Sequence, residues 1–447
     1  MAGPLRKVLR GLVASRRRAA TLPSWQREDL LFICTHGWQH YAFVHFAQPH
    51  DSGRAARLTS FGWSPGSPHR TLIEENLPHL EWPDHPDDTA AWREGWLRAF
   101  DKEKLSREFF KEYERIFRRV EELIAGISSV ERKRLFTQRL FNRLMFIAFI
   151  QKKGWLKLDG TTDYLGALWR AYERDKKEGR NFYRDRIKLL FFHALNTASE
   201  VDIIGINRGG QLKAVIGDVP YLNGGLFEED EDDKDAKIRI PDEAIGAVLN
   251  ELFSRFNFTV TESTPLDIEV AVDPEMLGKV FEELVTGRHE SGSYYTPKPV
   301  VSFMCREALK GYLVTQLPGE TAQAIAQFVE EQNASGLKNP EPVLEALRRV
   351  KVCDPACGSG AYLLGMLHEL LDLRACLFVT RKLDAISTYD RKLEIIQKNL
   401  YGVDNDPFAV NIARLRLWLS LAVDFEGENP PPLPNLDFKI EAGDSLT

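Results

Sequence analysis

Several features that would mark a specialised class of protein are scarce in this sequence. The 447 residues include five cysteines, with no CxxC pair and no regular spacing, so neither a disulfide framework nor a zinc finger is expected. No apolar run reaches the roughly 18 to 20 residues that cross a bilayer, because Asn142 and Arg143 interrupt the longest candidate. These absences favour a protein of a reducing, cytoplasmic compartment.

An excess of positive charge is also absent. The formal net charge is −6, which excludes a bulk polycation, so any nucleic-acid binding must come from local basic patches. Hydrophobic residues make up 43% and charged residues 28% of the chain, a balance that supports a sizeable core and argues against disorder. The length suggests about three domains.

The first 27 residues contain no acidic residue and several arginines. Three interpretations stay open for this segment: a transit peptide, a basic arm that touches phosphates, or a solvated terminus. We assign it to an N-terminal module of unclear role that spans residues 1–100. Short aromatic runs predict strands there, and therefore a small β-rich or α/β module, at residues 30–34, 41–46 and 58–63.

Residues 101–285 are predicted to form a helical domain, because their apolar residues recur at intervals of three and four. The arginines between residues 132 and 143 lie opposite one apolar stripe, and we expect them to face DNA. The acidic run 228–235 predicts a solvated loop, and its Asp-x-Lys pairs are not taken as a nuclease site. Asp273 and Pro274 predict the capped start of a further helix.

Residues 286–447 show a different pattern, in which strand and helix signals alternate. This alternation predicts a parallel, doubly wound sheet. Its strands are expected near residues 350–352, 400–403 and 438–440, and its helices near residues 299–316, 361–373 and 408–421. The polar, alanine-rich segment 318–340 is expected to be an exposed helix or a linker.

The strongest chemical motif runs from Asp354 to Gly360, where a short strand ends in an acid and turns through small residues into a helix. Such turns also serve dinucleotides, but the third glycine of G-x-G-x-x-G is replaced by Leu363. Asp354 would repel a pyrophosphate, whereas it would attract the ammonium group of S-adenosylmethionine. The turn is therefore predicted to bind a cationic nucleoside without phosphates.

Two further acids follow predicted strands. Asp404 is placed to accept hydrogen bonds from both ribose hydroxyls. It lies 44 residues after Gly360, against roughly 20 in the standard dinucleotide unit, which indicates a helical insertion over about residues 374–398. Asp406 is the expected N-cap of the next helix, with Pro407 at its first position. Asp444 is placed to accept a hydrogen bond from the adenine amine.

Together, the segments Asp354–Gly360, Gly402–Pro407 and Gly443–Ser445 resemble the cofactor half of an adenine-N6 DNA methyltransferase. Upstream, Gly292–Pro297 is similar to the Tyr-Thr-Pro segment of that family. This order resembles the gamma arrangement, which is shared with Eco57I-type (type IIG-like) restriction–modification enzymes and with phage-defence methylases. Similarity to the helical region of these enzymes extends the resemblance to roughly residues 100–447, through residues 136–140, 153–156, 221–227 and 273–278.

The resemblance implies a fold, a cofactor and a partner. The fold is α/β: a truncated Rossmann-like S-adenosylmethionine-dependent methyltransferase domain that follows the helical domain and the N-terminal module. The cofactor is S-adenosyl-L-methionine, the partner is DNA, and the compartment is the cytoplasm of a bacterium or an archaeon. The implied cofactor-binding residues are Tyr295, Thr296, Pro297, Asp354, Pro355, Ala356, Gly358, Gly360, Asp404, Asn405 and Asp444, and no metal ligand is expected.

One part of the family's catalytic machinery is missing from residues 1–447. Methylation of an exocyclic amine in this family uses an Asn/Asp-Pro-Pro-aromatic loop, which stacks on the flipped base. The segment Asn429–Pro432 has proline in place of the aromatic residue and precedes the third strand, so it is not that loop. We therefore expect the N-terminal part of a methyltransferase, inactive by itself, with a C-terminal partner chain that supplies catalysis and target recognition.

Alternative functions stay open at this point. The chain is also compatible with a non-catalytic scaffold subunit that binds S-adenosylmethionine, or with a decayed relic of such an enzyme. An NAD-dependent dehydrogenase is disfavoured by Asp354 and the missing third glycine. Related folds methylate protein amides or RNA, and the residues present do not distinguish these targets. Nuclease activity, the recognition sequence and the oligomeric state do not follow from the pattern.

Overall fold

The polypeptide divides into two units in the computed structural model. One comprises Met1–Ile116 and Gly246–Asp273, and the other Phe117–Ile245 and Pro274–Thr447. The predicted helical region contributes to both, and the division into three domains remains a prediction. The structure describes residues 9, 12, 30–36, 38, 40–47, 57–63, 70–82, 88–161, 163–196, 211–222, 225–259, 267–269, 271–272, 276–278, 296–381 and 387–446. Within these ranges, no helix combines the length and the apolar character that crossing a membrane requires.

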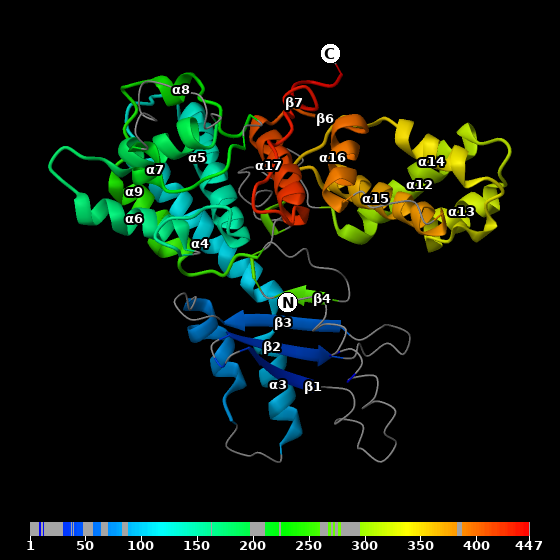
Figure 1. Cartoon of the computed structure of the whole chain (residues 1–447), viewed down its shortest axis with the longest axis horizontal. Coiled ribbons are helices and arrows are strands. Elements are labelled where there is room, and N and C mark those ends of the chain that lie inside the picture. The colour runs from blue at the N-terminus through cyan, green and yellow to red at the C-terminus, as the bar shows by residue number, and fades with distance from the viewer. Residues whose placement is uncertain are drawn as a thin grey trace. The chain divides into compact units, whose positions relative to one another are not determined.

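The first unit is built on a sheet of order β1-β2-β3-β4 (Figure 1). Its first three strands are antiparallel neighbours and confirm the strands predicted near residues 30–34, 41–46 and 58–63. The fourth pairs with β3 in parallel and comes from a segment that the sequence placed in the helical region. The strands are β1 (Leu30–His36), β2 (His40–Ala47), β3 (Arg57–Trp63) and β4 (Asp267–Glu269).

Apolar side chains fill both faces of this sheet, because successive residues of a strand point to opposite sides. Val44, Phe46 and Leu58 are buried in one cluster. On the other face, Phe61 packs against Phe100, which ends α3 (Thr89–Ala99), with 4.6 Å between the ring centroids. The unit also contains η1 (Leu72–Asn76), η2 (Leu77–Leu80), η7 (Val248–Phe253) and the start of α4 (Lys102–Leu123).

The helical part of the second unit surrounds α5 (Val130–Ile150), which Ser129 caps by accepting a hydrogen bond from the Arg132 amide. Every residue from Leu140 to Ile150 is buried, as expected of a helix that is apolar on nearly all sides. The other elements of this part are η3 (Gln151–Lys153), α6 (Tyr164–Asp175), η4 (Tyr183–Ile187), η5 (Leu189–Ala194), α7 (Gln211–Ile216), α8 (Glu231–Lys234) and α9 (Asp242–Ala247).

The acidic run is not a solvated loop, and three of the arginines predicted to face DNA bind it instead. Arg143 pairs with Asp233 at 2.9 Å, with only 5% and 1% of the two side chains exposed. Asp233 and Asp230 form a capping box that starts α8, so the run folds as a helical turn. We call this group the α5–α8 charge cluster, which consists of Arg132, Arg139, Arg143, Asp230, Asp232 and Asp233.

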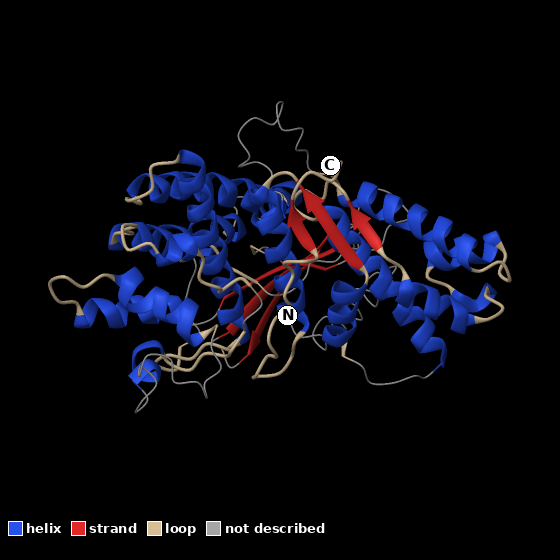
Figure 2. Ribbon diagram, turned by 90° about the horizontal axis from the view of Figure 1, so that it is seen from above, coloured by secondary structure: helices blue, strands red, loops and turns tan. Residues whose placement is uncertain are grey.

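The rest of the second unit contains the predicted parallel sheet. Its strands are β5 (Val352–Asp354), β6 (Leu400–Asp404) and β7 (Ile440–Ala442), in the order β5-β6-β7. Both neighbouring pairs are parallel, and Figure 2 shows the three strands side by side between helices. The helices that connect them are α15 (Ala361–Arg381), α16 (Thr388–Lys398) and α17 (Pro407–Asp424).

Two expectations for this region have different outcomes. The insertion predicted between the first helix and the second strand is confirmed, since the end of α15 and all of α16 lie there. The helix expected as one alternative over residues 318–340 is present as α13 (Ala322–Glu331), but it is not exposed on all sides, because one apolar face that includes Ile325, Phe328 and Val329 is buried. The neighbouring elements are α12 (Lys298–Gln316), η8 (Ala334–Gly336) and α14 (Pro340–Arg349).

Candidate cofactor site

Two of the predicted acids end adjacent strands of the parallel sheet. Asp354 closes β5 and Asp404 closes β6. Because the strands are parallel, both carboxylates lie at the same edge of the sheet, which we call the carboxyl edge. The turn 355–360 leaves this edge and leads into α15, and two of its glycines, Gly358 and Gly360, have left-handed φ values of 52° and 81°.

Asp404 connects all three sequence motifs. Its Oδ2 accepts a hydrogen bond from the Gly358 amide at 2.8 Å, and its Oδ1 accepts one from the Asp406 amide at 2.9 Å. Its backbone carbonyl accepts a third from the Gly443 amide at 2.9 Å. Since a carboxylate oxygen has two acceptor positions, each oxygen of Asp404 keeps one position for a ligand, which matches the two hydroxyls of a ribose.

Asp354 is held on one side only. Its Oδ1 accepts a hydrogen bond from the Ala356 amide at 3.2 Å, whereas its Oδ2 is buried without a hydrogen-bond partner among the described residues. Burial raises the pKa of Asp354, the Ala356 amide lowers it, and the charge of Asp404 raises it further. An unsatisfied buried carboxylate is costly, and a cationic donor such as an ammonium group would relieve that cost.

The glycines of the turn differ in what surrounds them. A Cβ atom at Gly358 would meet no atom within 4 Å, so open space lies beside this residue. A Cβ at Gly360 would lie 3.0 Å from that of Ala413 in α17, and one at Gly402 would lie 2.9 Å from Leu363. Gly358 therefore leaves room for a ligand, whereas Gly360 and Gly402 are required for packing.

An apolar pocket of about 250 Å³ adjoins Asp354. Two buried cysteines lie at the carboxyl edge, Cys305 in the wall of this pocket and Cys357 in the turn. Burial raises the pKa of each thiol to about 12, so neither is a nucleophilic thiolate near neutral pH. The described part of the chain contains no cluster of His, Cys, Asp and Glu that would hold a metal ion.

The other predicted residues lie around this edge to different degrees. Pro355 and Ala356 are exposed in the turn, and Asn405 is exposed directly after Asp404. Asp444 follows β7 in an exposed turn, where its Oδ1 accepts a hydrogen bond from the Leu446 amide at 2.9 Å. The N-cap expected at Asp406 is confirmed, because its side chain accepts a hydrogen bond from the Phe408 amide.

The Tyr-Thr-Pro segment is described only in part. Thr296 is half-buried and Pro297 is exposed. Pro297 occupies the N-cap position of α12, where its carbonyl accepts hydrogen bonds from the amides of Val300 and Val301. Tyr295 lies outside the described residues, as does the expected cap at Asp273.

One supporting residue was missed by sequence reasoning. Arg416 in α17 donates to the Ser359 carbonyl at 2.7 Å and to its hydroxyl at 3.3 Å, and so holds the turn from behind. A Cβ at Gly278 would lie 2.5 Å from the Arg416 guanidinium, so a larger residue there would have to displace that group. The available signal was an arginine on a largely apolar helix, since a charge that becomes buried needs a partner.

The sheet and its helices form an α/β unit that has two carboxylates at one edge. Residues 329–427 match a protein-family model described as the DNA-methyltransferase domain of MmeI. The chain is 33% identical over 338 residues to a type II restriction enzyme and methyltransferase of Methanocaldococcus jannaschii, an alignment that covers 70% of this chain and 27% of that protein. The predicted resemblance to restriction–modification methyltransferases is therefore confirmed.

Two other curated proteins are similar to this chain. DNA methyltransferase A of Bacillus subtilis is 21% identical over 353 residues, which cover 78% of this chain and 34% of that protein. The adenine-specific methyltransferase PglX of Streptomyces coelicolor is 31% identical over 110 residues, which cover 25% of this chain and 8% of that protein. The chain thus spans about a third or less of the length of the curated relatives that it matches.

Solved structures of two protein–DNA complexes are also similar to this chain. MmeI in complex with DNA aligns with a TM-score of 0.42 and 19% identity, over 70% of this chain and 36% of that chain. The DrdV–DNA complex aligns with a TM-score of 0.28 and 12% identity, over 93% of this chain and 36% of that chain.

Proposed function

We propose that this chain binds S-adenosylmethionine at the carboxyl edge and belongs to an enzyme that methylates the N6 amine of adenine in DNA. The observation that carries the cofactor assignment is the pair of carboxylates at the ends of β5 and β6, one of them with an unpartnered buried oxygen. Two carboxylates at one edge suit a cationic nucleoside and would repel the pyrophosphate of a dinucleotide.

Each residue of the edge then has a distinct task. Asp404 accepts hydrogen bonds from the ribose hydroxyls with the acceptor positions that Gly358 and Asp406 leave open. Asp354 attracts the ammonium group, and Gly358 leaves space for the cofactor beside the backbone. Following the family resemblance, the segment Tyr295–Pro297 holds the methionine carboxylate, Asn405 lies against the nucleoside, and Asp444 accepts a hydrogen bond from the adenine amine.

The choice of substrate rests on similarity. When bound, S-adenosylmethionine supplies an electrophilic methyl group that an amine of the substrate accepts. DNA as the substrate is supported by the matched family model and by the names of the curated relatives, and adenine by the name of PglX and by the motif resemblance. The name of the Methanocaldococcus relative supports a place for the chain in restriction–modification, and a role in phage defence rests on the motif resemblance alone.

Calorimetric titration of S-adenosylmethionine into the purified chain tests the cofactor assignment, with NADH as the control ligand. Saturable binding of S-adenosylmethionine without binding of NADH is expected. Asp404→Ala should cost roughly 1–3 kcal/mol of binding free energy, or about 5- to 150-fold in affinity. Glu428→Ala, which removes an exposed carboxylate of the same unit, should leave the affinity unchanged. Binding of NADH, or equal affinity of the Asp404 variant and the parent, would refute the assignment.

A further inference from the structure

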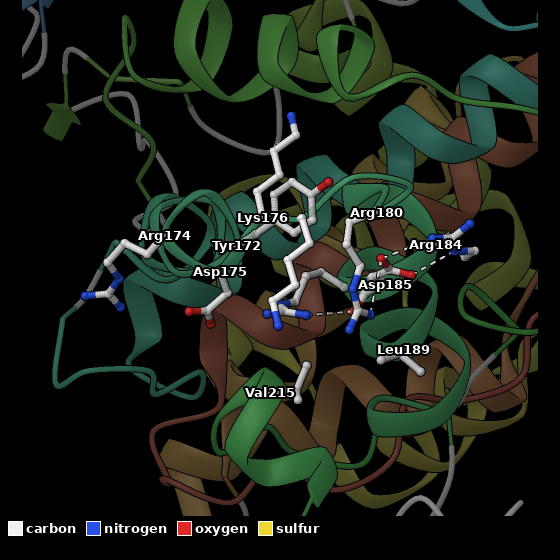
Figure 3. A pocket seen from close by; sticks show the side chains of 11 residues that line it. Tyr172, Arg174, Asp175, Lys176, Arg180, Arg184, Asp185, Leu189 and Val215 are labelled. Carbon is white, nitrogen blue, oxygen red and sulfur yellow. Dashed lines mark hydrogen bonds and ion pairs between the residues drawn. The ribbon is translucent and has the colours of Figure 1, made fainter.

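A second pocket lies in the helical part of the second unit, where no sequence motif was recognised. Its volume is about 610 Å³, and it extends from the end of α6 to η4 and η5, with α7 on one side. Figure 3 shows Arg174 and Asp175 on one side of it, Arg180 and Arg184 with Asp185 on the other, and Leu189 and Val215 beside them. We call it the basic pocket; its cationic residues are Arg174, Lys176, Lys177, Arg180, Arg184 and Arg186.

The charge of the basic pocket contrasts with that of the whole chain. Six cationic side chains line it together with two carboxylates, Asp175 and Asp185, although the chain as a whole has a net charge of −6. Arg174 and Lys176 pair with Asp159 and Asp242, which lie outside the lining, and Arg180 and Arg184 share Asp185. Lys177 forms no ion pair among the described residues, and the buried Nε atom of Arg186 has no hydrogen-bond partner. The pocket therefore retains unsatisfied donors and a local positive potential, which attracts anions.

Two of the cations are held in place by a largely buried carboxylate. Asp185, whose side chain is 11% exposed, pairs with Arg184 at 2.8 Å and with Arg180 at 3.6 Å. Its backbone carbonyl accepts a hydrogen bond from Arg186 at 3.1 Å. Burial of Asp185 would raise its pKa, but Arg184, the Asn181 amide and Arg180 together lower it, so it stays ionised and orders the arginines around it.

The lining favours a nucleic-acid backbone over a small molecule. Pockets for nucleosides and similar ligands have mostly apolar walls with a few polar groups, whereas only three residues here are uncharged: Tyr172, Leu189 and Val215. The arginine side chains are also well exposed, with 70% for Arg174, 56% for Arg180 and 60% for Arg184. Exposed guanidinium groups that project from a surface suit the phosphates of a duplex, which approach from solvent.

We infer that the basic pocket receives backbone phosphates of duplex DNA while the carboxyl edge holds the cofactor, an inference that rests on the proposed action on DNA. The DNA contact is thereby assigned to the cations of the basic pocket and not to the α5 arginines, which were predicted to face DNA. Contacts of this kind carry no base specificity, so the pocket would position the duplex rather than read its sequence.

The test compares two triply substituted chains by fluorescence anisotropy with a short labelled duplex over a range of salt concentrations. The first variant carries Lys177→Gln, Arg180→Gln and Arg184→Gln. The control carries Arg349→Gln, Lys398→Gln and Arg107→Gln, which remove exposed cations outside the pocket. We expect the pocket variant to bind roughly tenfold or more weakly at low salt, and its salt slope to fall by about 0.9 for each phosphate that it no longer neutralises. The control should change neither quantity.

Calorimetry with S-adenosylmethionine, run on both variants, distinguishes failure of this inference from failure of the proposed function and reports correct folding. Unchanged DNA affinity and slope in a pocket variant that binds the cofactor would overturn the inference and leave the proposed function intact. The inference would also be overturned if the pocket variant lost the parent's binding of inorganic phosphate or ATP but kept its DNA binding. The pocket would then be a site for a small anion. A parent chain that binds the cofactor but no DNA would contradict both the inference and the DNA assignment.

Discussion

The α5–α8 charge cluster and the carboxyl edge each contain an aspartate with a buried carboxylate oxygen, but the two aspartates have opposite surroundings. Asp233 lies against Arg143, which also donates to the carbonyls of Leu226 and Glu228. Asp354 has an amide on one oxygen and no hydrogen-bond partner among the described residues on the other. Burial raises the pKa of both. The difference separates a carboxylate whose partners all come from the fold from one that has an unpartnered oxygen.

The largest effect is expected from removal of Arg143. Arg143→Ala leaves Asp233 as an uncompensated buried charge, which should lower the free energy of unfolding by about 3–5 kcal/mol, measured by urea denaturation. Arg349→Ala, at an exposed pair, should cost less than about 1 kcal/mol. The double substitution Arg143→Met with Asp233→Leu should recover much of the loss, because no unpaired charge remains. A loss below about 1 kcal/mol for Arg143→Ala would remove the contrast between the two aspartates.

A smaller effect of opposite sign is expected at Asp354. Asp354→Asn keeps the oxygen that caps Ala356 and removes the unpartnered charge, so it should raise the free energy of unfolding by about 0.5–1 kcal/mol at neutral pH. The same variant should bind S-adenosylmethionine more weakly, because the ammonium group loses its counter-charge. Thermal denaturation and calorimetry on one preparation measure the two changes. A variant that loses stability as well as affinity would make Asp354 a structural residue.

The pH dependence gives this comparison a second test. Because the folded-state pKa of Asp354 is raised, ionisation is penalised in the folded chain. The penalty is absent below the ordinary aspartate pKa of about 3.9 and is fully present once the pH exceeds the raised value. The stability gain of Asp354→Asn should therefore be largest at neutral pH and should vanish in acid. A gain that is independent of pH would indicate a cause other than charge.

A further small effect on stability is expected at Gly358. Here the cost of the backbone conformation can be measured apart from the cost of a steric contact. Gly358→Ala introduces a Cβ that meets no atom, so only the left-handed φ of 52° opposes it, at a cost of about 1 kcal/mol in stability. Gly360→Ala has the same backbone cost and an additional contact with Ala413, so it should be less stable than Gly358→Ala. Thermal denaturation of the two variants checks this order, and the reverse order would place the open space at Gly360.

Local signals in the sequence predicted much of the second unit. The strands ending at Asp354 and Asp404 and the capped start of α17 follow from apolar runs, turn residues and Asp-Pro chemistry, which act over a few residues. The three motifs also predicted a common site, because parallel strands bring their carboxyl ends together. The spacing of the motifs did not predict that hydrogen bonds to Asp404 itself join them.

Contacts between distant segments were not predictable. Arg143 and Asp233 are 90 residues apart. Arg143 was predicted to face DNA and Asp233 to lie in a solvated loop, because charged residues are usually at the surface. β4 joins the first sheet from a segment more than two hundred residues after β3. The basic pocket escaped notice because Arg174, Arg180 and Arg184 lie in a polar stretch of mixed charge, and only the fold shows that these cations line one pocket.

The position of Asp404 also has a consequence for how mutations in this site combine. One side chain and its own carbonyl hold the amides of Gly358, Asp406 and Gly443, which come from three separate turns. Substitutions in these turns share a common partner, so their energetic effects should not be independent. Loss of one turn displaces the acceptor on which the other two depend. We therefore expect the three turns to keep or lose their conformation together. A substitution in one turn should then limit which substitutions the other two turns can accept.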